Sequence, residues 1–149
     1  MFVLALLLGF YGYGIFALGV LGRLYEADIF VWTAFVGSIG IFYLRRSFKI
    51  RIPKEFRMTS LQWFILLLLV SLAGVNLIGV IGPETSFDAL WYLLTLPKFF
   101  LQDHTIRFIP GGLLYYSVMP KLGEMFFIPA LLWGDEIWAK ALQCIFGIV

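Results

Sequence analysis

The chain has 149 residues, of which 62% are hydrophobic and 13% are charged, and its formal net charge is +2. Soluble domains carry about 25% charged residues, so this composition, with a mean hydropathy of +0.96, excludes an ordinary soluble domain. It predicts an all-α, polytopic integral membrane protein whose residues 1–149 form a single membrane domain.

Three apolar runs in residues 1–82 predict three transmembrane helices. Residues 1–22 and 58–82 contain no charged side chain, and at about 1.5 Å per residue both exceed the roughly 30 Å hydrocarbon core. Residues 29–44 form a shorter run, which Arg45 and Arg46 can extend by reaching the headgroups. Glycines recur in all three runs, which predicts close approach of the helices. The expected helices are 2–21, 29–44 and 61–81.

The charged connections predict how the chain is oriented in the membrane. Residues 45–57 carry six basic side chains and one acidic side chain. The positive-inside rule places this segment in the cytoplasm, and residues 23–28 and 83–120 outside it. A lipid-headgroup or nucleic-acid site is the other interpretation of the basic segment. We expect contact with membrane lipid and no nucleic-acid partner.

Residues 83–120 form an extracytoplasmic loop that carries polar side chains directly after an uncharged span. A helix is expected from Thr85 to about Leu96, where Pro97 ends or kinks it. This helix should be amphipathic and lie along the membrane surface, with aromatic rings at headgroup depth. The residues that share one face at helical spacing are Asp88, Trp91, Tyr92 and Thr95.

Two acidic residues have both a structural and a functional interpretation. Thr85-x-x-Asp88 fits a capping box, in which the acid bonds a backbone N–H at the helix start. A carboxylate at the membrane–water boundary can also act as a general base on an acceptor hydroxyl, and the two roles are compatible. Glu124, near the start of an apolar helix, is either a functional acid or a partner of the helix dipole.

The basic residues of the loop suggest contact with phosphate. Lys98 and Arg107 can pair with a lipid-linked phosphate, or they can reach the headgroups as ordinary interfacial residues. His104 beside Asp103 does not make a set of metal ligands. We therefore expect no metal and no cofactor, and the sequence gives no support for a divalent ion.

Residues 121–149 are expected to form a helical hairpin with helices at 124–133 and 137–149. Gly134-Asp135-Glu136 should connect the two helices and cap the second. The second helix is shorter than the roughly 20 residues of a membrane span and has no cap or polar tail at its end. This predicts that the chain is part of a longer protein.

Several segments, taken in order, resemble one family of membrane enzymes. They are PETSFDALWY at 83–92, LPKFF at 96–100, PKLGEMFF at 120–127 and GDEIWAK at 134–140. In this order they resemble the first outer loop of GT-C-type membrane glycosyltransferases, in particular bacterial and archaeal relatives of the protein mannosyltransferases. The resemblance covers residues 83–149, and residues 1–82 match only as hydrophobic spans.

The resemblance implies an enzyme that takes a sugar from a polyprenyl-phosphate carrier and passes it to an acceptor outside the cytoplasm. By motif position, Asp88 would be the catalytic base and Glu124 a second catalytic candidate. The residues that would bind the substrate are Glu84, Tyr92, Lys98 and Arg107.

Two features depart from the family pattern. Relatives usually have a histidine directly after the tyrosine of this motif, where the present chain has Leu93. The chain is also much shorter than the family architecture and resembles an amino-terminal portion of it. The alternative function is therefore a non-enzymatic membrane assembly subunit or an inactive remnant. A transporter ranks lowest, because the first three helices carry few polar residues.

Overall fold

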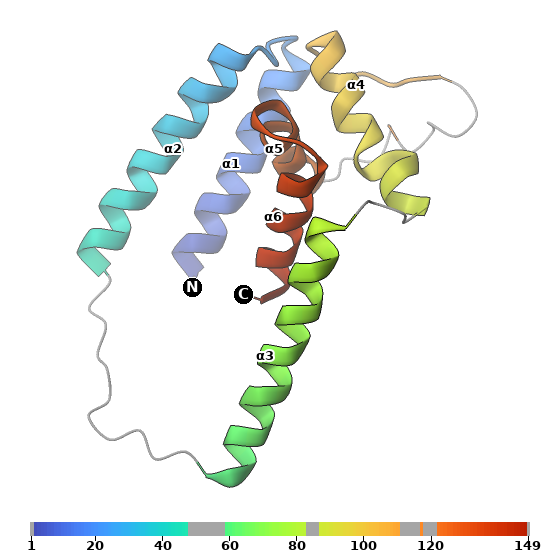
Figure 1. The fold of residues 1–149 in the computed structure, drawn as a ribbon. Helices are drawn as coiled ribbons and strands as arrows, with labels where there is room; N and C mark the ends of the chain where they lie inside the picture. The colour runs from blue at the N-terminus through green and yellow to red at the C-terminus, as the bar shows by residue number, and fades with distance from the viewer. Residues whose placement is uncertain (1, 48–58, 83–86, 111–116, 118–121, 149) are drawn as a thin grey trace.

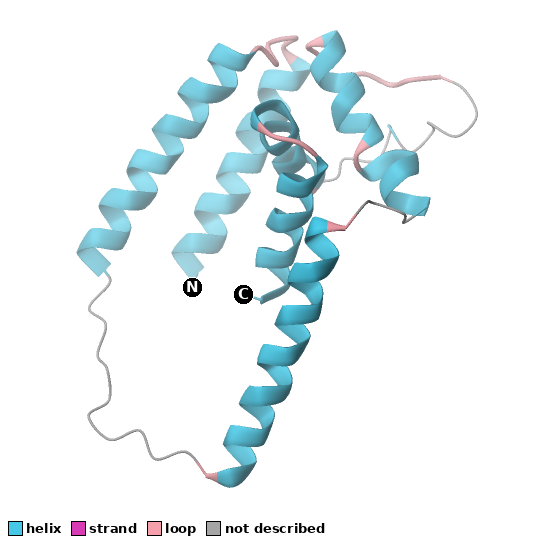
Figure 2. Cartoon of the chain, in the orientation of Figure 1, coloured by secondary structure: helices cyan, strands magenta, loops and turns pink. Residues whose placement is uncertain are grey.

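Helices make up almost all of the structure. The computed structural model describes residues 2–47, 59–82, 87–110, 117 and 122–148. Within these ranges there are six α-helices and no strand, as Figure 2 shows. The all-α prediction is confirmed for this part of the chain.

The first two helices, α1 (Phe2–Val20) and α2 (Glu26–Ser47), pack side by side as a hairpin (Figure 1). The Trp32 indole lies over Gly14, where an added Cβ would come within 2.0 Å of the ring. Trp32 Nε1 also donates to the Tyr11 carbonyl at 3.2 Å. The predicted close approach is thus present at Gly14, whereas the glycines within α2 and α3 meet no neighbour within 4 Å in the described part of the chain.

α1 ends at Val20 because the chain turns sharply at Gly22. Gly22 has a φ of 68°, in the left-handed region that favours glycine. The Arg23 amide donates to the Leu18 carbonyl at 2.8 Å, and the Gly22 amide donates to the Gly19 carbonyl at 3.1 Å. This pair of bonds is the Schellman arrangement, which satisfies the last carbonyls of a helix.

Among the described residues, two helices are long and apolar enough to cross a membrane, Glu26–Tyr43 within α2 and α3 (Ser60–Ile81). The sequence predicts three such spans. In α1 the apolar stretch that the structure describes is Ala5–Val20, which is shorter than a span. Core helices of soluble proteins can also be long and apolar, but the apolar window of α3 is 0% buried.

α3 extends away from the other helices for most of its length (Figure 1). It begins with a capping box: the Gln62 side chain accepts from the Thr59 amide at 2.9 Å, and the Thr59 hydroxyl accepts from the Gln62 amide at 3.4 Å. Val80, near the other end, is the one buried residue of α3. The helix that packs mainly against α3 is α6.

The helix predicted for residues 85–96 is divided into two elements. A π-helical segment, η1 (Ala89–Leu93), ends where the Leu94 amide bonds the Ala89 carbonyl at 3.0 Å. α4 (Thr95–Asp103) then continues through Pro97. The expected helix thus breaks at Leu94, shortly before Pro97. This proline lies in the first turn of α4, where an N–H has no helical partner to lose.

The C-terminal part consists of η3 (Glu124–Phe126), α5 (Phe127–Trp133) and α6 (Glu136–Ile148), and α5 packs against α6. Asp135 caps α6, since its Oδ1 accepts from the Ile137 amide at 2.8 Å, as the sequence predicts. At about 1.5 Å per residue, α5 and α6 reach roughly 10 and 20 Å. α5, which ends within the chain at Trp133, is therefore too short to cross a bilayer alone.

The hydrophobic core lies at one end of the molecule, where α1, α2, α4 and α5 meet. Two backbone bonds join distant segments there: the Leu24 amide donates to the His104 carbonyl at 3.1 Å, and the Ile106 amide donates to the Gly19 carbonyl at 2.9 Å. The core residues are Ile15, Leu24, Ile29, Leu96, Phe100, Met125 and Ile128.

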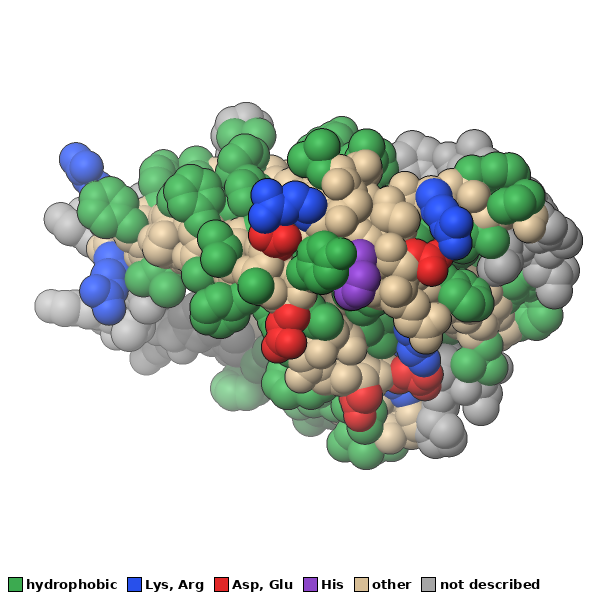
Figure 3. Space-filling model, turned by 90° about the horizontal axis from the view of Figure 1, so that it is seen from above, with side chains coloured by type: hydrophobic (Ala, Val, Ile, Leu, Met, Phe, Trp, Pro, Cys, Tyr) green, Lys and Arg blue, Asp and Glu red, His purple; other side chains and the backbone are tan. Residues whose placement is uncertain are grey.

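Charged side chains gather over this same end, together with the single histidine (Figure 3). The α1–α2 turn and the end of α4 both contribute to it (Figure 1). The sequence assigns residues 23–28 and 83–120 to the same side of the membrane. In the structure, residues 23–28 and the described part of 83–120 lie at one end of the molecule.

Candidate functional site

A pocket of about 550 Å³, with both apolar and polar lining, lies between the end of α3, the middle of α4 and the start of α6. Its apolar lining comes from residues such as Ile81, Leu101 and Ile137. Its polar lining is Lys98, Gln102, Asp135, Glu136 and Lys140. Of the predicted site residues that the structure describes, only Lys98 is in this pocket.

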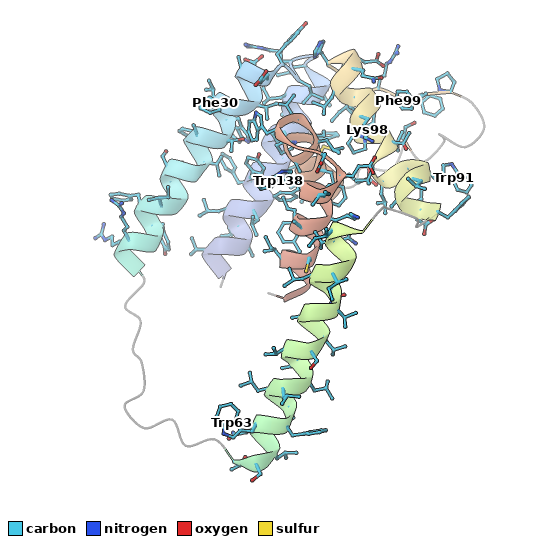
Figure 4. The ribbon with its side chains drawn as sticks, viewed as in Figure 1. Phe30, Trp63, Trp91, Lys98, Phe99 and Trp138 are labelled. Carbon is cyan, nitrogen blue, oxygen red and sulfur yellow. The ribbon has the colours of Figure 1, made fainter. Side chains whose placement is uncertain are left out.

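Lys98 and Glu136 form an ion pair at the pocket. The distance from Lys98 Nζ to Glu136 Oε1 is 2.6 Å, and the two side chains are 47% and 39% exposed. Figure 4 shows Lys98 on α4, and the pair joins this helix to the start of α6. Because both groups are partly exposed, a ligand can reach each of them without unfolding the structure.

Lys140 brings a second ammonium group to the pocket. Its Nζ donates to the Gly82 carbonyl at the C-terminal end of α3. A cation is favourable there because the last carbonyls of a helix carry partial negative charge. The two lysines thus come from α4 and α6 and lie beside the end of the apolar α3.

The pocket can recognise both an anion and hydroxyl groups. Ammonium groups bind phosphate oxygens through charge-assisted hydrogen bonds, while carboxylates and the Gln102 amide oxygen accept hydrogen bonds from hydroxyls. Asp135 is already engaged, because its Oδ1 accepts from the Ile137 and Trp138 amides. Glu136 is therefore the carboxylate of the pocket that faces a lysine.

Asp88, the predicted base, does not line the pocket. It is exposed where η1 begins, and in the described structure its side chain makes no hydrogen bond to the amides of that helix. Thr85 lies outside the described residues, so only one half of the predicted capping box is seen. The Asp88 carboxylate is accessible from solvent.

The predicted shared face of Asp88, Trp91 and Tyr92 is divided between two environments. Tyr92 packs against the core, whereas Trp91 and the exposed Phe87 make an edge-on contact with ring centroids 4.4 Å apart. Figure 4 shows Trp91 pointing away from the helices. The α-helical spacing does not hold here, because hydrogen bonds in a π-helix span five residues instead of four.

Arg107 lies apart from the pocket and pairs locally. Its guanidinium donates to Asp103 at 2.8 Å, four residues back, and is 63% exposed. The neighbouring His104 stacks on Tyr25 with ring centroids 4.2 Å apart. His104 thus holds the end of α4 against the α1–α2 turn.

Glu124, the second predicted catalytic acid, is not in the pocket either. Glu124 is 4% exposed, in η3 beside α1, so it is separated from solvent while Asp88 is not. Burying a carboxyl group costs free energy unless hydrogen bonds or opposite charges around it replace its lost hydration. Glu84 lies outside the described residues. Among the residues that are described, no three His, Cys, Asp or Glu side chains could hold a metal ion.

Sequence reasoning missed Lys140 and Gln102 and assigned Glu136 only to the connection between helices. A signal for Lys140 was present, because an ionisable residue within an apolar run is a functional candidate by default. Gln102 carries no comparable signal, since a single amide on a short helix is common.

No protein-family model matches this chain, and comparisons with curated proteins and with solved structures find no match. The likeness to GT-C-type glycosyltransferases therefore depends on the sequence motifs alone.

Proposed function

We propose that this chain is a membrane glycosyltransferase, or the amino-terminal portion of one, that transfers a sugar from a polyprenyl-phosphate donor to an extracytoplasmic acceptor. The observation that carries the proposal is the position of the pocket. Lys98 and Lys140 lie beside Gly82, where the lipid-like surface of α3 ends. A polyprenyl phosphate needs an apolar surface for its tail and cations for its phosphate, and the two occur together here.

The exposed surface of α3 supports a membrane location. Its large side chains, among them Trp63, Leu67 and Ile78, are 60%, 68% and 74% exposed. A helix that is apolar all round is normally buried in a protein or in a membrane. We propose that α1, α2 and α3 all cross the bilayer, with the pocket outside and the basic residues 45–57 in the cytoplasm.

The proposed chemistry is displacement at the anomeric carbon of the donor sugar. The acceptor oxygen forms a bond to that carbon, the bond from carbon to phosphate oxygen breaks, and the acceptor proton passes to Asp88. The phosphate leaves on its polyprenyl carrier, and Lys98 with Lys140 stabilises its negative charge. Asp88 directly precedes η1, and Lys98 lies in the next element, α4. The buried Glu124 is less accessible to an acceptor.

The second candidate is a non-enzymatic assembly subunit or an inactive remnant. Leu93 favours it, because this residue replaces the histidine usual in the family resembled. Such a protein would retain the membrane helices and could retain lipid binding, but it would transfer no sugar.

The test is sugar transfer in membranes that contain the chain, with radiolabelled polyprenyl-phosphate mannose and glucose as donors. We expect Asp88→Asn to lower the rate by about 100-fold or more, as for loss of a general base. Asp103→Asn, which removes an exposed acid outside the pocket, should have no effect.

Full transfer by Asp88→Asn would contradict the assignment of the base. Donor binding without transfer by the wild-type chain would favour the assembly subunit or remnant, and absence of both would contradict the proposed function.

A further inference from the structure

The charges of the described residues that line the pocket cancel, which is unexpected for a site that binds only phosphate. Two ammonium groups, on Lys98 and Lys140, are matched by the carboxylates of Asp135 and Glu136. Glu136 lies 2.6 Å from the Lys98 ammonium, so any anion that binds Lys98 must compete with this carboxylate. A function for Glu136 should explain why an acid occupies this position.

We propose that Glu136 is a specificity-determining residue, which makes the pocket accept a glycosylated lipid phosphate and discriminate against the bare lipid phosphate that remains after transfer. This inference rests on the proposed function. It concerns the selection between donor and spent carrier at the same pocket, and it assigns no step of the transfer to Glu136.

The two lipids differ in charge and in hydrogen-bond donors. The donor is a phosphodiester with one negative charge, and its sugar carries several hydroxyl donors. The spent carrier is a phosphomonoester with a charge of about −1.5 to −2 at pH 7, and it has no sugar. A site separates such ligands best when it attracts one and also repels the other.

Glu136 can do both. When a phosphodiester replaces it on Lys98, the displaced carboxylate needs a new donor, and a sugar hydroxyl can supply one. When a bare monoester binds Lys98, the Glu136 carboxylate faces a larger negative charge and receives no hydroxyl. The repulsion between the two anions then weakens binding of the spent carrier.

The ion pair is a poor candidate for a purely structural role. Exposed pairs contribute about 0–1 kcal/mol to stability in general, and both members of this pair are partly exposed. The Arg107–Asp103 pair, at 2.8 Å and with exposures of 63% and 36%, is a matched pair outside the pocket. It provides a control for the loss of an exposed ion pair.

The experiment measures binding by the full chain in phosphatidylcholine nanodiscs, because detergents with sugar headgroups would compete. The ligands are dodecyl phosphate and its mannosyl and glucosyl diesters, titrated by calorimetry. We expect the wild-type chain to prefer a diester. Glu136→Gln should bind dodecyl phosphate about five- to tenfold more tightly, through the loss of one like charge, and the diester with equal or lower affinity.

Two further variants make the result specific to the pocket. Lys98→Gln should weaken binding of both kinds of ligand, and Asp103→Asn should change neither. Circular dichroism of each variant, compared with the wild-type chain, shows whether the fold is retained.

The inference on Glu136 is overturned if Glu136→Gln changes the affinity for the diester and for the bare phosphate by the same factor, or changes neither. In that case the proposed function stands, because the donor still binds. If no ligand binds the wild-type chain, both the inference and the proposed function are overturned.

Discussion

Gly14 is the residue on which the α1–α2 hairpin most directly depends. The Trp32 ring occupies the space that a side chain at this position would need, with an ideal Cβ only 2.0 Å from the ring. The indole cannot easily turn away, because its Nε1 is bonded to the Tyr11 carbonyl. Gly9, on the same helix, has no described neighbour within 4 Å of its own Cβ position.

We therefore expect Gly14→Leu to destabilise the fold by roughly 1–3 kcal/mol, the usual cost of overpacking. Gly9→Leu should be nearly neutral, since it adds the same side chain where space is open. Thermal unfolding of both variants in detergent micelles measures the difference. Equal midpoints for the two variants would contradict the packing described for Trp32.

The residues that line the pocket could be predicted from the sequence only in part. Lys98 was found from its chemistry, because a cation at the membrane edge suits a phosphate. Lys140 joins it only through the packing of α6 on α3 and α5, which no local pattern of residues encodes. Arg107 shows the reverse case: it follows the end of α4 and pairs with Asp103, the last residue of that helix, so it lies outside the pocket.

Among the elements, α3 carries the membrane proposal. The large apolar side chains along it are exposed, and the apolar window has 0% of its residues buried. Within the described structure, its contacts are mainly with α6 near one end. An apolar helix of this length in water would be an aggregation hazard, whereas in a bilayer the same surface is solvated by lipid.

A charged residue placed in the middle of α3 tests whether this helix lies in the bilayer or in water. Leu69→Arg should lower the fraction of chains inserted in the membrane, because an arginine at the centre of a span costs about 2.5–3.5 kcal/mol. Leu69→Ala, which removes a similar apolar group without adding charge, is the matched control. Insertion is measured by resistance to alkaline extraction. If Leu69→Arg leaves insertion unchanged, α3 does not lie in the hydrocarbon core.

The helices themselves were largely predictable from apolar runs and turn residues. α3 was expected at 61–81 and is found at Ser60–Ile81. α2 is longer than expected because Glu26 and Asp28 lie in its first turn and Arg45 and Arg46 in its last, where each charge is favourable to the helix dipole. The π-helical η1 was not predictable, because its hydrogen bonds differ from the α-helical pattern that sequence periodicity reports.

For the whole molecule, the main result is the placement of polar and apolar surfaces. The α1–α2 turn and the end of α4 share one end of the structure, where charged side chains gather. The pocket with Lys98 and Lys140 lies between this end and the bare surface of α3. A lipid-linked phosphate would thus bind with its phosphate in the pocket and its tail along α3.

Photo-crosslinking of a bound donor tests this account most directly. The probe is a polyprenyl-phosphate sugar with a diazirine on the isoprene unit next to the phosphate, bound to the chain in membranes and mapped by peptide sequencing. We expect labels at the end of α3 and in residues 98–102 and 134–140. Excess unlabelled donor should remove these labels, and Lys98→Gln should weaken them. Labels spread evenly over the membrane helices, or unaffected by unlabelled donor, would contradict it.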